Sequence, residues 1–455
     1  MMDDKIIEEL KLIVGADFVS TGDSVRELHS HDESFHAPVL PDVVVFPRST
    51  EEVSKVVKLA YNNDIPITPW GVGTSLEGNP IPYHKGICID FQYMNKVLTV
   101  RKEDFQVDVQ VGVVYKELNK MLSRYGLFFP PDPGAAATIG GMIGNNASGI
   151  RTVRYGATKD NIMKIKVVLS NGEIIDLGTR ARKSSSGYNL CALFIGSEGT
   201  LGIITEATLK LVGLPGGFTA LRAVFPEVIN ATDTVFQVMS SGLMPAAMEF
   251  LDSHVMAVLN RDRGLSLHEM PTLLMEFHGY NEEGLKPELD FVEDICRENG
   301  CIFLDKGIGA AERARLWEMR HLTFESIKRS HPGLLPLIMD VAVPLSRYSE
   351  MVDYIKGEIK GLTAYVFGHA GDGNIHVIVM DRPDDKTRWR RVEEINERIV
   401  LMALRLEGTC SGEHGVGIGK RGFLPIEHGE GLEVMKRIKE LFDPKGILNP
   451  GKFFL

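Results

Sequence analysis

The feature that most constrains the fold of this chain is a set of three glycine-rich segments, at residues 69–78, 130–149 and 195–204. Clusters of glycine, proline and asparagine interrupt regular structure, so each segment is predicted to be a loop. Glycine also lets backbone N–H groups surround a phosphate, because no Cβ atom blocks a concave turn. One such loop is most often a plain surface turn, but three in one chain weigh against that interpretation.

The first loop follows a predicted β-α-β unit. The apolar run at 42–46 indicates a buried strand, and Ser49 and Glu52 form a helix-capping pattern. Residues 65–68 then predict a second strand that runs directly into the loop. Further along, valines alternate with polar residues at 107–111, which is typical of a half-buried strand.

Composition excludes several classes of protein. The chain has 455 residues with 61 acidic and 50 basic side chains, a net charge of −11, and lacks the basic balance of a nucleic-acid-binding protein. The acidic N-terminus resembles neither a signal nor a transit peptide, and the longest uncharged stretch, 133–150, holds too many glycines to span a membrane. We therefore expect a cytoplasmic protein. The cysteines are scattered without a C-x-x-C pair, which argues against disulfide, zinc-ribbon and iron–sulfur frameworks; they are Cys88, Cys191, Cys296, Cys301 and Cys410.

Two common phosphate-binding motifs do not fit the glycine loops. Gly71 and Gly73 follow the second strand of the unit, and Pro80 and Pro82 prevent the helix that a dinucleotide fingerprint requires. The segment 415–421 lacks the first glycine and the final hydroxyl residue of a Walker loop. Neither NAD nor ATP is indicated.

The order and spacing of the three loops resemble the FAD-binding domain of the vanillyl-alcohol oxidase/p-cresol methylhydroxylase (PCMH) type. The resemblance covers about 38–215 and resumes at 443–450. In that family the first loop holds the pyrophosphate and the other two line the flavin. None of these loops contains a histidine, to which some relatives attach the flavin, so we expect non-covalent FAD. The resemblance implies these FAD-binding residues: Gly71, Gly73, Thr74, Ser75, Pro131, Thr138, Gly141, Asn145, Gly149, Gly199, Ile204 and Asn449.

A second motif is the segment 367–377, in which Asp372-Gly373 between apolar runs is a hairpin-turn signal. If these are the two turn residues, His369 lies opposite His376 on one face, with Cβ atoms about 4.5–5.5 Å apart. Both imidazoles can then reach one divalent ion. The alternative is a pair of core histidines that are satisfied by hydrogen bonds.

A third motif is Glu413-His414, within the segment 410–417. An oxygen ligand beside a histidine suits metal-assisted proton abstraction, and an unperturbed histidine, with a pKa of about 6.5, serves as a base near neutral pH. Taken alone, such a pair is more often a turn with a surface acid.

Together with the flavin loops, these motifs resemble the D-2-hydroxyacid dehydrogenase branch of the family, which includes D-lactate dehydrogenases, glycolate oxidase FAD subunits and D-2-hydroxyglutarate dehydrogenases. The resemblance implies that His369, His376 and Glu413 bind a divalent metal (Zn, Mn or Fe) and that His414 is the catalytic base. The family's substrate-carboxylate arginine corresponds to Arg320, which by itself would be interpreted as a helix-surface residue. The hypothesis is metal-assisted removal of the hydroxyl proton and hydride transfer to flavin N5.

Hydroxyglutarate-type members carry a threonine one turn after that arginine and a lysine before a strand aspartate. Here the corresponding places hold Phe324 and the segment 336–343, which has no basic residue. Burying a second carboxylate without a partner is costly. The expected substrate is therefore a small D-2-hydroxy monocarboxylate, D-lactate or glycolate, which is oxidised to the 2-oxo acid.

The resemblance predicts an α+β fold with a two-subdomain, PCMH-type FAD-binding domain and an α+β cap domain that contains an antiparallel sheet. The predicted boundaries are an N-terminal helical segment 1–37, the FAD domain 38–215, the cap or substrate domain 216–410, and a C-terminal segment 411–455 that returns to the FAD domain.

Without iron–sulfur cysteines, the reduced flavin needs a separate electron acceptor: an iron–sulfur subunit, an electron-transfer flavoprotein, or a cytochrome or quinone. Such a partner could also hold the protein at a membrane surface. The rival functions are a hydroxyglutarate-type dehydrogenase, an electron-transfer subunit without a substrate site, a metal-dependent hydrolase, and the alkylglycerone-phosphate synthase branch of the family.

Overall fold

The computed structural model describes residues 2–454, and the chain divides into two compact units. Unit 1 comprises Met1–Ser148, Gly156–Leu214 and Glu413–Leu455. Unit 2 comprises Gly149–Tyr155 and Pro215–Gly412.

Unit 1 begins with a four-stranded sheet in the order β1-β2-β4-β3, in which β2 and β3 run parallel to β4. Helix α3 connects β2 to β3 and is capped by Ser49, whose hydroxyl accepts from the Glu52 N–H. The predicted β-α-β unit is confirmed, and β3 leads directly into the first glycine loop. The elements are α1 (Asp4–Val14), β1 (Val19–Ser20), α2 (Asp23–Leu28), β2 (Val43–Val45), α3 (Thr50–Asn62), β3 (Ile67–Trp70) and β4 (Ile87–Asp90).

The second sheet of unit 1 has five antiparallel strands in the order β5-β6-β10-β8-β9, and its apolar side packs against α4, α5 and α7. Val107 and Val109 of β6 are buried while Asp108 between them is partly exposed, as the alternation predicts. Strands β7 and β11 form a separate two-stranded antiparallel sheet. The remaining elements of unit 1 are β5 (Val97–Arg101), β6 (Gln106–Gln110), α4 (Tyr115–Leu122), β7 (Leu127–Phe128), α5 (Ile139–Asn145), β8 (Ile162–Val168), β9 (Ile174–Gly178), α7 (Leu190–Phe194), β10 (Ile203–Lys210), β11 (Val212–Gly213), α14 (Leu424–His428) and α15 (Gly431–Phe442).

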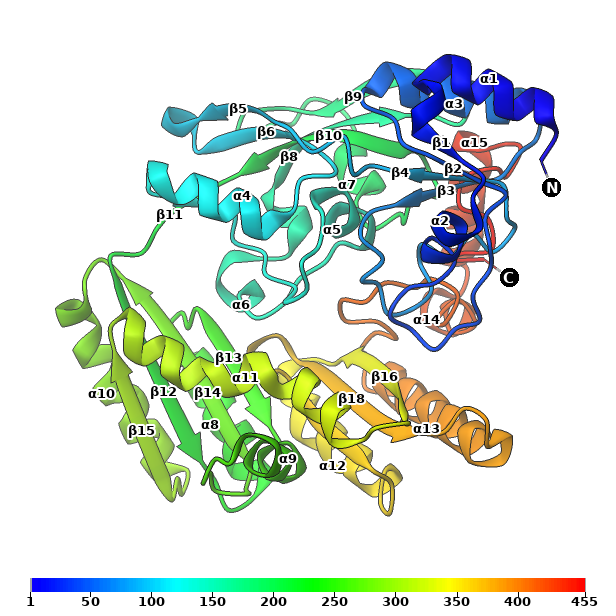
Figure 1. Ribbon diagram of the computed structural model, residues 1–455. Coiled ribbons are helices and arrows are strands. Elements are labelled where there is room, and N and C mark those ends of the chain that lie inside the picture. The colour runs from blue at the N-terminus through cyan, green and yellow to red at the C-terminus, as the bar shows by residue number, and fades with distance from the viewer. Residues whose placement is uncertain (1, 455) are drawn as a thin grey trace. The chain divides into compact units, whose positions relative to one another are not determined.

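Unit 2 is built on a seven-stranded antiparallel sheet in the order β15-β12-β14-β13-β17-β18-β16. Helix α11 lies across one face of this sheet beside α9, as Figure 1 shows. The elements are α6 (Thr152–Tyr155), β12 (Gly217–Val224), α8 (Val228–Ser240), β13 (Ala247–Leu251), α9 (Ser253–Arg263), β14 (Thr272–Gly279), α10 (Glu282–Glu298), β15 (Phe303–Ile308), α11 (Ala310–Ser330), β16 (Leu335–Ala342), α12 (Tyr348–Glu358), β17 (Ala364–His369), β18 (Asn374–Asp381) and α13 (Lys386–Arg405).

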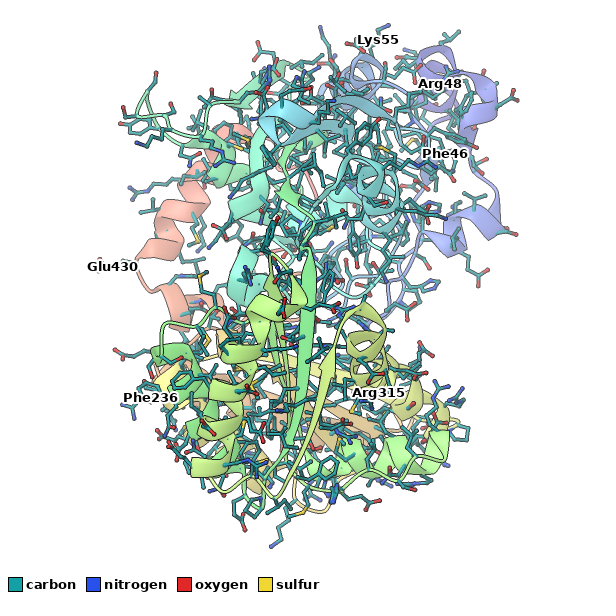
Figure 2. All side chains as sticks on the ribbon, turned by 90° about the vertical axis from the view of Figure 1, so that its left-hand side faces the viewer. Phe46, Arg48, Lys55, Phe236, Arg315 and Glu430 are labelled. Atoms are coloured by element: carbon teal, nitrogen blue, oxygen red, sulfur yellow. The ribbon has the colours of Figure 1, made fainter. Side chains whose placement is uncertain are left out.

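The two sides of α11 have different environments. Leu316, Trp317 and Met319 are buried against apolar residues of the sheet and of α9. On the outer side, Arg315 bonds the carboxylates of Asp305 and Glu312 and is about half exposed; Figure 2 labels it. This amphipathic packing fixes the rotation of the helix about its axis.

The hairpin between β17 and β18 differs from the predicted two-residue turn. Residues 370–372 form a short 3-10 turn, Gly373 adopts a left-handed conformation with φ of 73°, and Phe367 rather than His369 pairs with His376. The predicted register is therefore wrong by two residues. A shift of two preserves the side on which each side chain points, whereas a shift of one would reverse it. His369 and His376 consequently still share one face of the sheet.

The observed architecture confirms the predicted α+β class with an antiparallel sheet in the second half of the chain. All five cysteines are free thiols. No helix within residues 2–454 has the length and apolar character needed to cross a bilayer.

Candidate functional site

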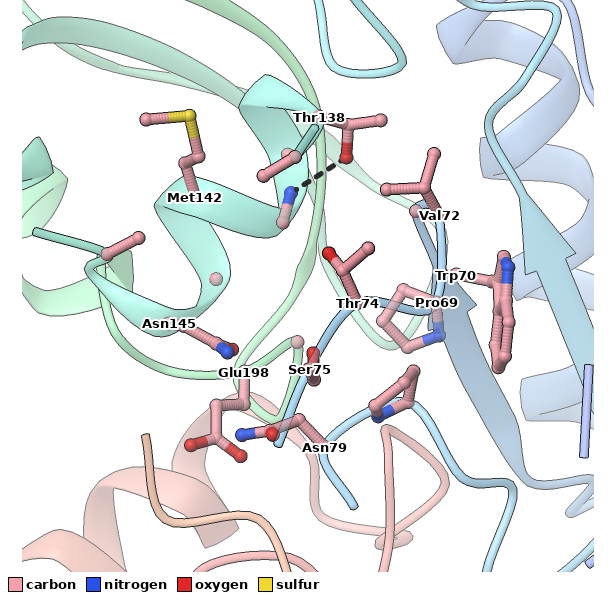
Figure 3. A pocket seen from close by; sticks show the side chains of 18 of the residues that line it. Pro69, Trp70, Val72, Thr74, Ser75, Asn79, Thr138, Met142, Asn145 and Glu198 are labelled. Atoms are coloured by element: carbon pink, nitrogen blue, oxygen red, sulfur yellow. Dashed lines mark hydrogen bonds between the residues drawn. The ribbon is translucent and has the colours of Figure 1, made fainter. Parts of the chain in front are cut away.

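Unit 1 contains a pocket with about 1270 Å³ of empty space, which includes its open side. The three glycine-rich loops all contribute to its lining, as do Glu413 and His414 from the returning C-terminal segment. Figure 3 shows Thr74 and Ser75 of the first loop facing Asn145 of α5 across this space.

Glycine is required at several positions in the wall of this pocket. A Cβ atom on Gly71 would lie 2.6 Å from the Thr138 hydroxyl, which caps α5 by accepting from the Gly141 N–H at 3.2 Å. Gly199 has φ of 71°, and a Cβ atom there would lie 2.6 Å from Pro69. The loops therefore approach one another more closely than side chains allow, and the resulting cradle fits an extended cofactor with a pyrophosphate.

The predicted flavin residues fall largely in this pocket. Pro131 is buried outside its lining, and Gly149 belongs to unit 2. The role of every one of these residues in binding FAD remains a prediction. The predicted residues that line the pocket are Gly71, Gly73, Thr74, Ser75, Thr138, Gly141, Asn145, Gly199, Ile204 and Asn449.

Glu198 anchors the loop that carries His414. The Glu198 carboxylate accepts from the N–H of Val416 at 2.6 Å and from the N–H of Gly417 at 3.0 Å. Asn145 donates to the carbonyl of His414 at 3.3 Å. Burial raises the pKa of Glu198 above its ordinary value, although these hydrogen bonds oppose the shift. Glu198 is not among the site residues predicted from the sequence.

A row of polar side chains lies on one face of the sheet in unit 2, the face that α9 and α11 cover. Glu249 lies between two residues of the apolar cluster on β13, and the side chains of His369 and His376 point to the same side. The imidazole centroids of the two histidines are 5.2 Å apart, and both side chains are buried.

Glu249 joins two residues that the sequence singled out. Its Oε1 lies 2.5 Å from Nδ1 of His369, within hydrogen-bonding distance. Its Oε2 accepts from Nε of Arg320 at 2.6 Å. Burial raises the pKa of Glu249, but the neighbouring His369 and Arg320 lower it, and the net pKa lies below the ordinary value. The Arg320 guanidinium also lies over the ring of Phe367, 5.0 Å from its centroid.

His376 has a comparable environment on the neighbouring strand. Asp340 of β16 is directly opposite His376 in the ladder, and its Oδ1 lies 3.6 Å from Nδ1 of the imidazole. Asn374 donates to the same carboxylate at 2.7 Å. Asn374 also donates to the Val341 carbonyl at 3.0 Å and so links β18 to β16. Neither Asp340 nor Asn374 is among the site residues predicted from the sequence.

The donor set of unit 2 fits a divalent metal. Nδ1 of His369 bonds the buried Glu249 carboxylate at 2.5 Å, whereas Nδ1 of His376 lies 3.6 Å from the buried Asp340 carboxylate, beyond hydrogen-bonding distance. Metal-binding histidines usually present one nitrogen to the metal and use the other to bond a carboxylate or carbonyl. The predicted third ligand, Glu413, belongs to unit 1, where its carboxylate accepts from the Ser148 hydroxyl at 3.0 Å. The complete ligand set therefore remains a prediction.

A second acid–arginine pair lies along the same face. Glu276 of β14 bonds Nε of Arg313 at 2.7 Å and Nε2 of His278 at 2.5 Å, and His278 bonds the Tyr155 hydroxyl at 2.7 Å. Burial lowers the pKa of His278. Arg313 and Arg320 are two turns apart on α11, so one helix supplies a cation to each of two buried carboxylates.

Comparison with known proteins places this geometry in a family. A model of the FAD binding domain matches residues 41–178, and a model of the C-terminal domain of FAD linked oxidases matches residues 216–453. The chain therefore belongs to the FAD-linked oxidase family and is an FAD-dependent oxidoreductase.

Individual relatives agree with this assignment. The chain is 42% identical to a mitochondrial D-lactate dehydrogenase (cytochrome) of Arabidopsis thaliana, over 98% of this chain and 80% of the relative. It is 34% identical to glycolate oxidase subunit GlcD of Bacillus subtilis, over 100% of this chain and 97% of the relative. The solved structure of p-cresol methylhydroxylase with bound substrate shares the fold, with a TM-score of 0.78 and 15% identity over 99% of this chain and 96% of that chain. The predicted PCMH-type fold is confirmed.

Proposed function

We propose that this protein oxidises a small D-2-hydroxy monocarboxylate, D-lactate or glycolate, to the 2-oxo acid. The observation that carries the proposal is the cluster of Glu249, Arg320, His369 and His376 on one face of unit 2, in a chain that belongs to the FAD-linked oxidases. A flavin-binding electron-transfer subunit would not need these buried polar groups. The names of the two curated relatives support the substrate class.

His414 is the proposed base that removes the substrate hydroxyl proton. Its position on the rim of the flavin pocket supports this role, since a base must lie close to the carbon that delivers its hydride to the flavin. Bound FAD would supply the acceptor for that hydride, and a divalent metal held by His369, His376 and Glu413 would lower the pKa of the substrate hydroxyl. Glu198 and Asn145 hold the backbone around His414, so the imidazole is presented from a fixed loop.

His369, His376 and Glu413 are the proposed ligands of a divalent metal, which would be Zn, Mn or Fe. Two buried imidazoles whose centroids are 5.2 Å apart, one of them bonded through Nδ1 to a buried carboxylate, support the histidine part of this set. The inclusion of Glu413 rests on the resemblance of the Glu413-His414 motif to that of the family. Imidazole and carboxylate ligands together suit each of these three metals.

Arg320 is the proposed partner of the substrate carboxylate. Its Nε is bonded to Glu249, while neither Nη atom bonds another residue within 2–454, so both can donate to a ligand. Phe324, one turn further along α11, packs with the apolar cluster instead of offering a hydroxyl. The lack of a hydroxyl at position 324 supports a monocarboxylate, because a second carboxylate would lose that hydrogen-bond partner.

A separate electron acceptor completes the proposal, because the five free cysteines are scattered along the chain. An iron–sulfur subunit, an electron-transfer flavoprotein, and a cytochrome or quinone remain candidates, and the word cytochrome in the name of the Arabidopsis relative supports the last group. Non-covalent FAD is supported by the absence of histidine from the three glycine loops. The cytoplasmic location remains a prediction, since that relative is named as mitochondrial.

Steady-state kinetics with an artificial electron acceptor test the proposed specificity. We expect kcat/KM to be higher for D-lactate or glycolate than for D-2-hydroxyglutarate, and a chelator to lower the rate with every substrate. A clear preference for the dicarboxylate would support the hydroxyglutarate-type alternative. Activity that survives complete metal removal would contradict the metal part of the proposal.

A further inference from the structure

Glu249 is an acidic residue in the middle of a fully buried strand. Strand β13 has the sequence Ala-Met-Glu-Phe-Leu, and every one of its residues is buried. Glu249 lies opposite His369 in the ladder with β17, while Arg320 reaches it from α11, the helix that crosses this face in Figure 1. One side chain thus connects two strands and a helix.

The burial of this carboxylate requires compensation. An ionised carboxylate in the interior is strongly unfavourable unless its oxygens are paired. Glu249 has one partner on each oxygen, Nδ1 of His369 on Oε1 and Nε of Arg320 on Oε2. Both contacts are short, at 2.5 and 2.6 Å, as charge-assisted hydrogen bonds are.

We propose that Glu249 is a positioning residue that aligns the metal ligand His369 and the substrate-binding Arg320 at the same time. Its bond to Nδ1 fixes the imidazole in the tautomer whose Nε2 carries the lone pair that a metal needs. Its bond to Nε of Arg320 directs the two Nη atoms of the guanidinium toward the substrate carboxylate. This inference rests on the proposed function, and it adds that metal binding and substrate binding share one support.

The chemistry of the side chain predicts the effect of an isosteric change. In Glu249→Gln, the single carbonyl oxygen can accept from His369 or from Arg320, but not from both in the present geometry. If the carbonyl accepts from His369, the amide NH₂ faces the N–H of Arg320, which is also a donor. If the carbonyl accepts from Arg320, the amide NH₂ donates to Nδ1 of His369, which requires the tautomer whose proton lies on Nε2. That tautomer cannot ligate a metal through Nε2.

Glu276 provides a matched control on the same face. It is also fully buried, also bonds Nε of an arginine of α11, and also contacts an imidazole, that of His278. Its partners Arg313 and His278 are not among the proposed metal or substrate residues. Glu276→Gln therefore reproduces the structural disturbance of Glu249→Gln without the proposed functional consequence.

The experiment measures the binding of Mn²⁺ to the purified, FAD-loaded full-length proteins by electron paramagnetic resonance. We expect Glu249→Gln to weaken Mn²⁺ binding by about 10- to 100-fold, the usual effect of removing such an outer partner. Glu276→Gln is expected to bind Mn²⁺ as the wild type does. The same proteins are then assayed with D-lactate at saturating Mn²⁺, where we expect the KM of Glu249→Gln to rise because Arg320 has lost its support.

The outcomes separate this inference from the proposed function. Wild-type affinity for Mn²⁺ and a wild-type KM in Glu249→Gln would overturn the inference and leave the proposed function intact. A wild-type protein that binds no Mn²⁺ and oxidises no hydroxy acid would overturn both. Equal losses in Glu249→Gln and Glu276→Gln would indicate a purely structural role and would also overturn the inference.

A second variant protects the test against misfolding. Glu249→Asp retains the negative charge but withdraws the carboxylate by one methylene group, so it cannot span both partners. If Glu249→Gln does not yield folded protein, the same two measurements on Glu249→Asp decide the question. Weakened Mn²⁺ binding together with a raised KM supports the shared role, and wild-type values for both refute it.

Discussion

Replacement of Glu198 tests whether the loop that carries His414 is held by a buried carboxylate. Glu198→Ala removes the acceptor of the Val416 and Gly417 N–H groups, which the carboxylate now bonds at 2.6 and 3.0 Å. A buried donor that is left without a partner costs about 1–3 kcal/mol. Two such donors predict a loss of about 2–6 kcal/mol in the free energy of unfolding of unit 1.

Glu198→Gln gives the matched comparison, because its carbonyl oxygen still accepts from these N–H groups. We expect it to remain within about 1 kcal/mol of the wild type, the scale of one ordinary hydrogen bond. Burial raises the pKa of Glu198, so folding favours its protonated form. The wild type therefore loses stability relative to Glu198→Gln as the pH rises from the ordinary glutamate pKa of about 4.3 through the raised value.

Urea titration followed by flavin fluorescence reports the opening of the FAD pocket, and stopped-flow absorbance reports flavin reduction. Glu198→Ala should release FAD at lower urea and reduce the flavin more slowly, since the loop around His414 has lost two anchors. Wild-type stability in Glu198→Ala, or equal damage from alanine and glutamine, would refute the reasoning.

Three further predictions follow from other parts of unit 1. Burial lowers the pKa of His36 to about 4, so the folded state disfavours the protonated imidazole. At about 1.4 kcal/mol per pH unit, the free energy of unfolding should fall by about 3 kcal/mol as the pH falls from 6.5 through 4. Urea midpoints relative to His36→Gln measure this loss. Gly199→Ala should weaken FAD retention in equilibrium dialysis, because its Cβ would clash with Pro69, whereas Gly134→Ala, with a similar φ of 79° but open space around it, should retain FAD. His414→Ala should abolish flavin reduction by D-lactate while FAD stays bound, and undiminished reduction would exclude His414 as the base.

Local patterns were sufficient to predict much of unit 1. The strand at 43–45, the capped helix α3 and the following strand each have a strong local signal, and the glycine loops mark the places where these elements turn. The flavin residues were assigned by resemblance, and most of them line the pocket. The strands and the helix follow local sequence, whereas the loops are fixed by long-range contacts such as those of Gly71 with Thr138 and of Gly199 with Pro69.

The hairpin of unit 2 shows where local reasoning fails. The Asp372-Gly373 signal located the turn, but tertiary contacts decided its length. Gly373 packs so closely on Val343 that a Cβ atom would lie 2.0 Å from the Val343 carbonyl oxygen, so the turn is shaped by the chain that follows β16. The register differs from the predicted one by two residues. Because this shift is even, the two histidines still lie on one face of the sheet.

The supporting acids were missed although a local signal existed. Glu249, Glu276 and Asp340 each interrupt a strongly apolar strand, and an acid in such a run must find a partner when it is buried. Each acid has a partner that lies far away along the chain, so local sequence does not identify it. Arg320 follows Glu249 by 71 residues, and no periodicity within either element connects them.

Anaerobic reduction of the bound flavin tests the central claim most directly. The purified protein is mixed with D-lactate, L-lactate or glycolate in the absence of oxygen and of any acceptor, and flavin absorbance is followed in time. We predict that D-lactate or glycolate bleaches the flavin in a single turnover and that L-lactate does not. Flavin that stays oxidised with all three acids, or that L-lactate reduces as fast as D-lactate, would contradict the assignment.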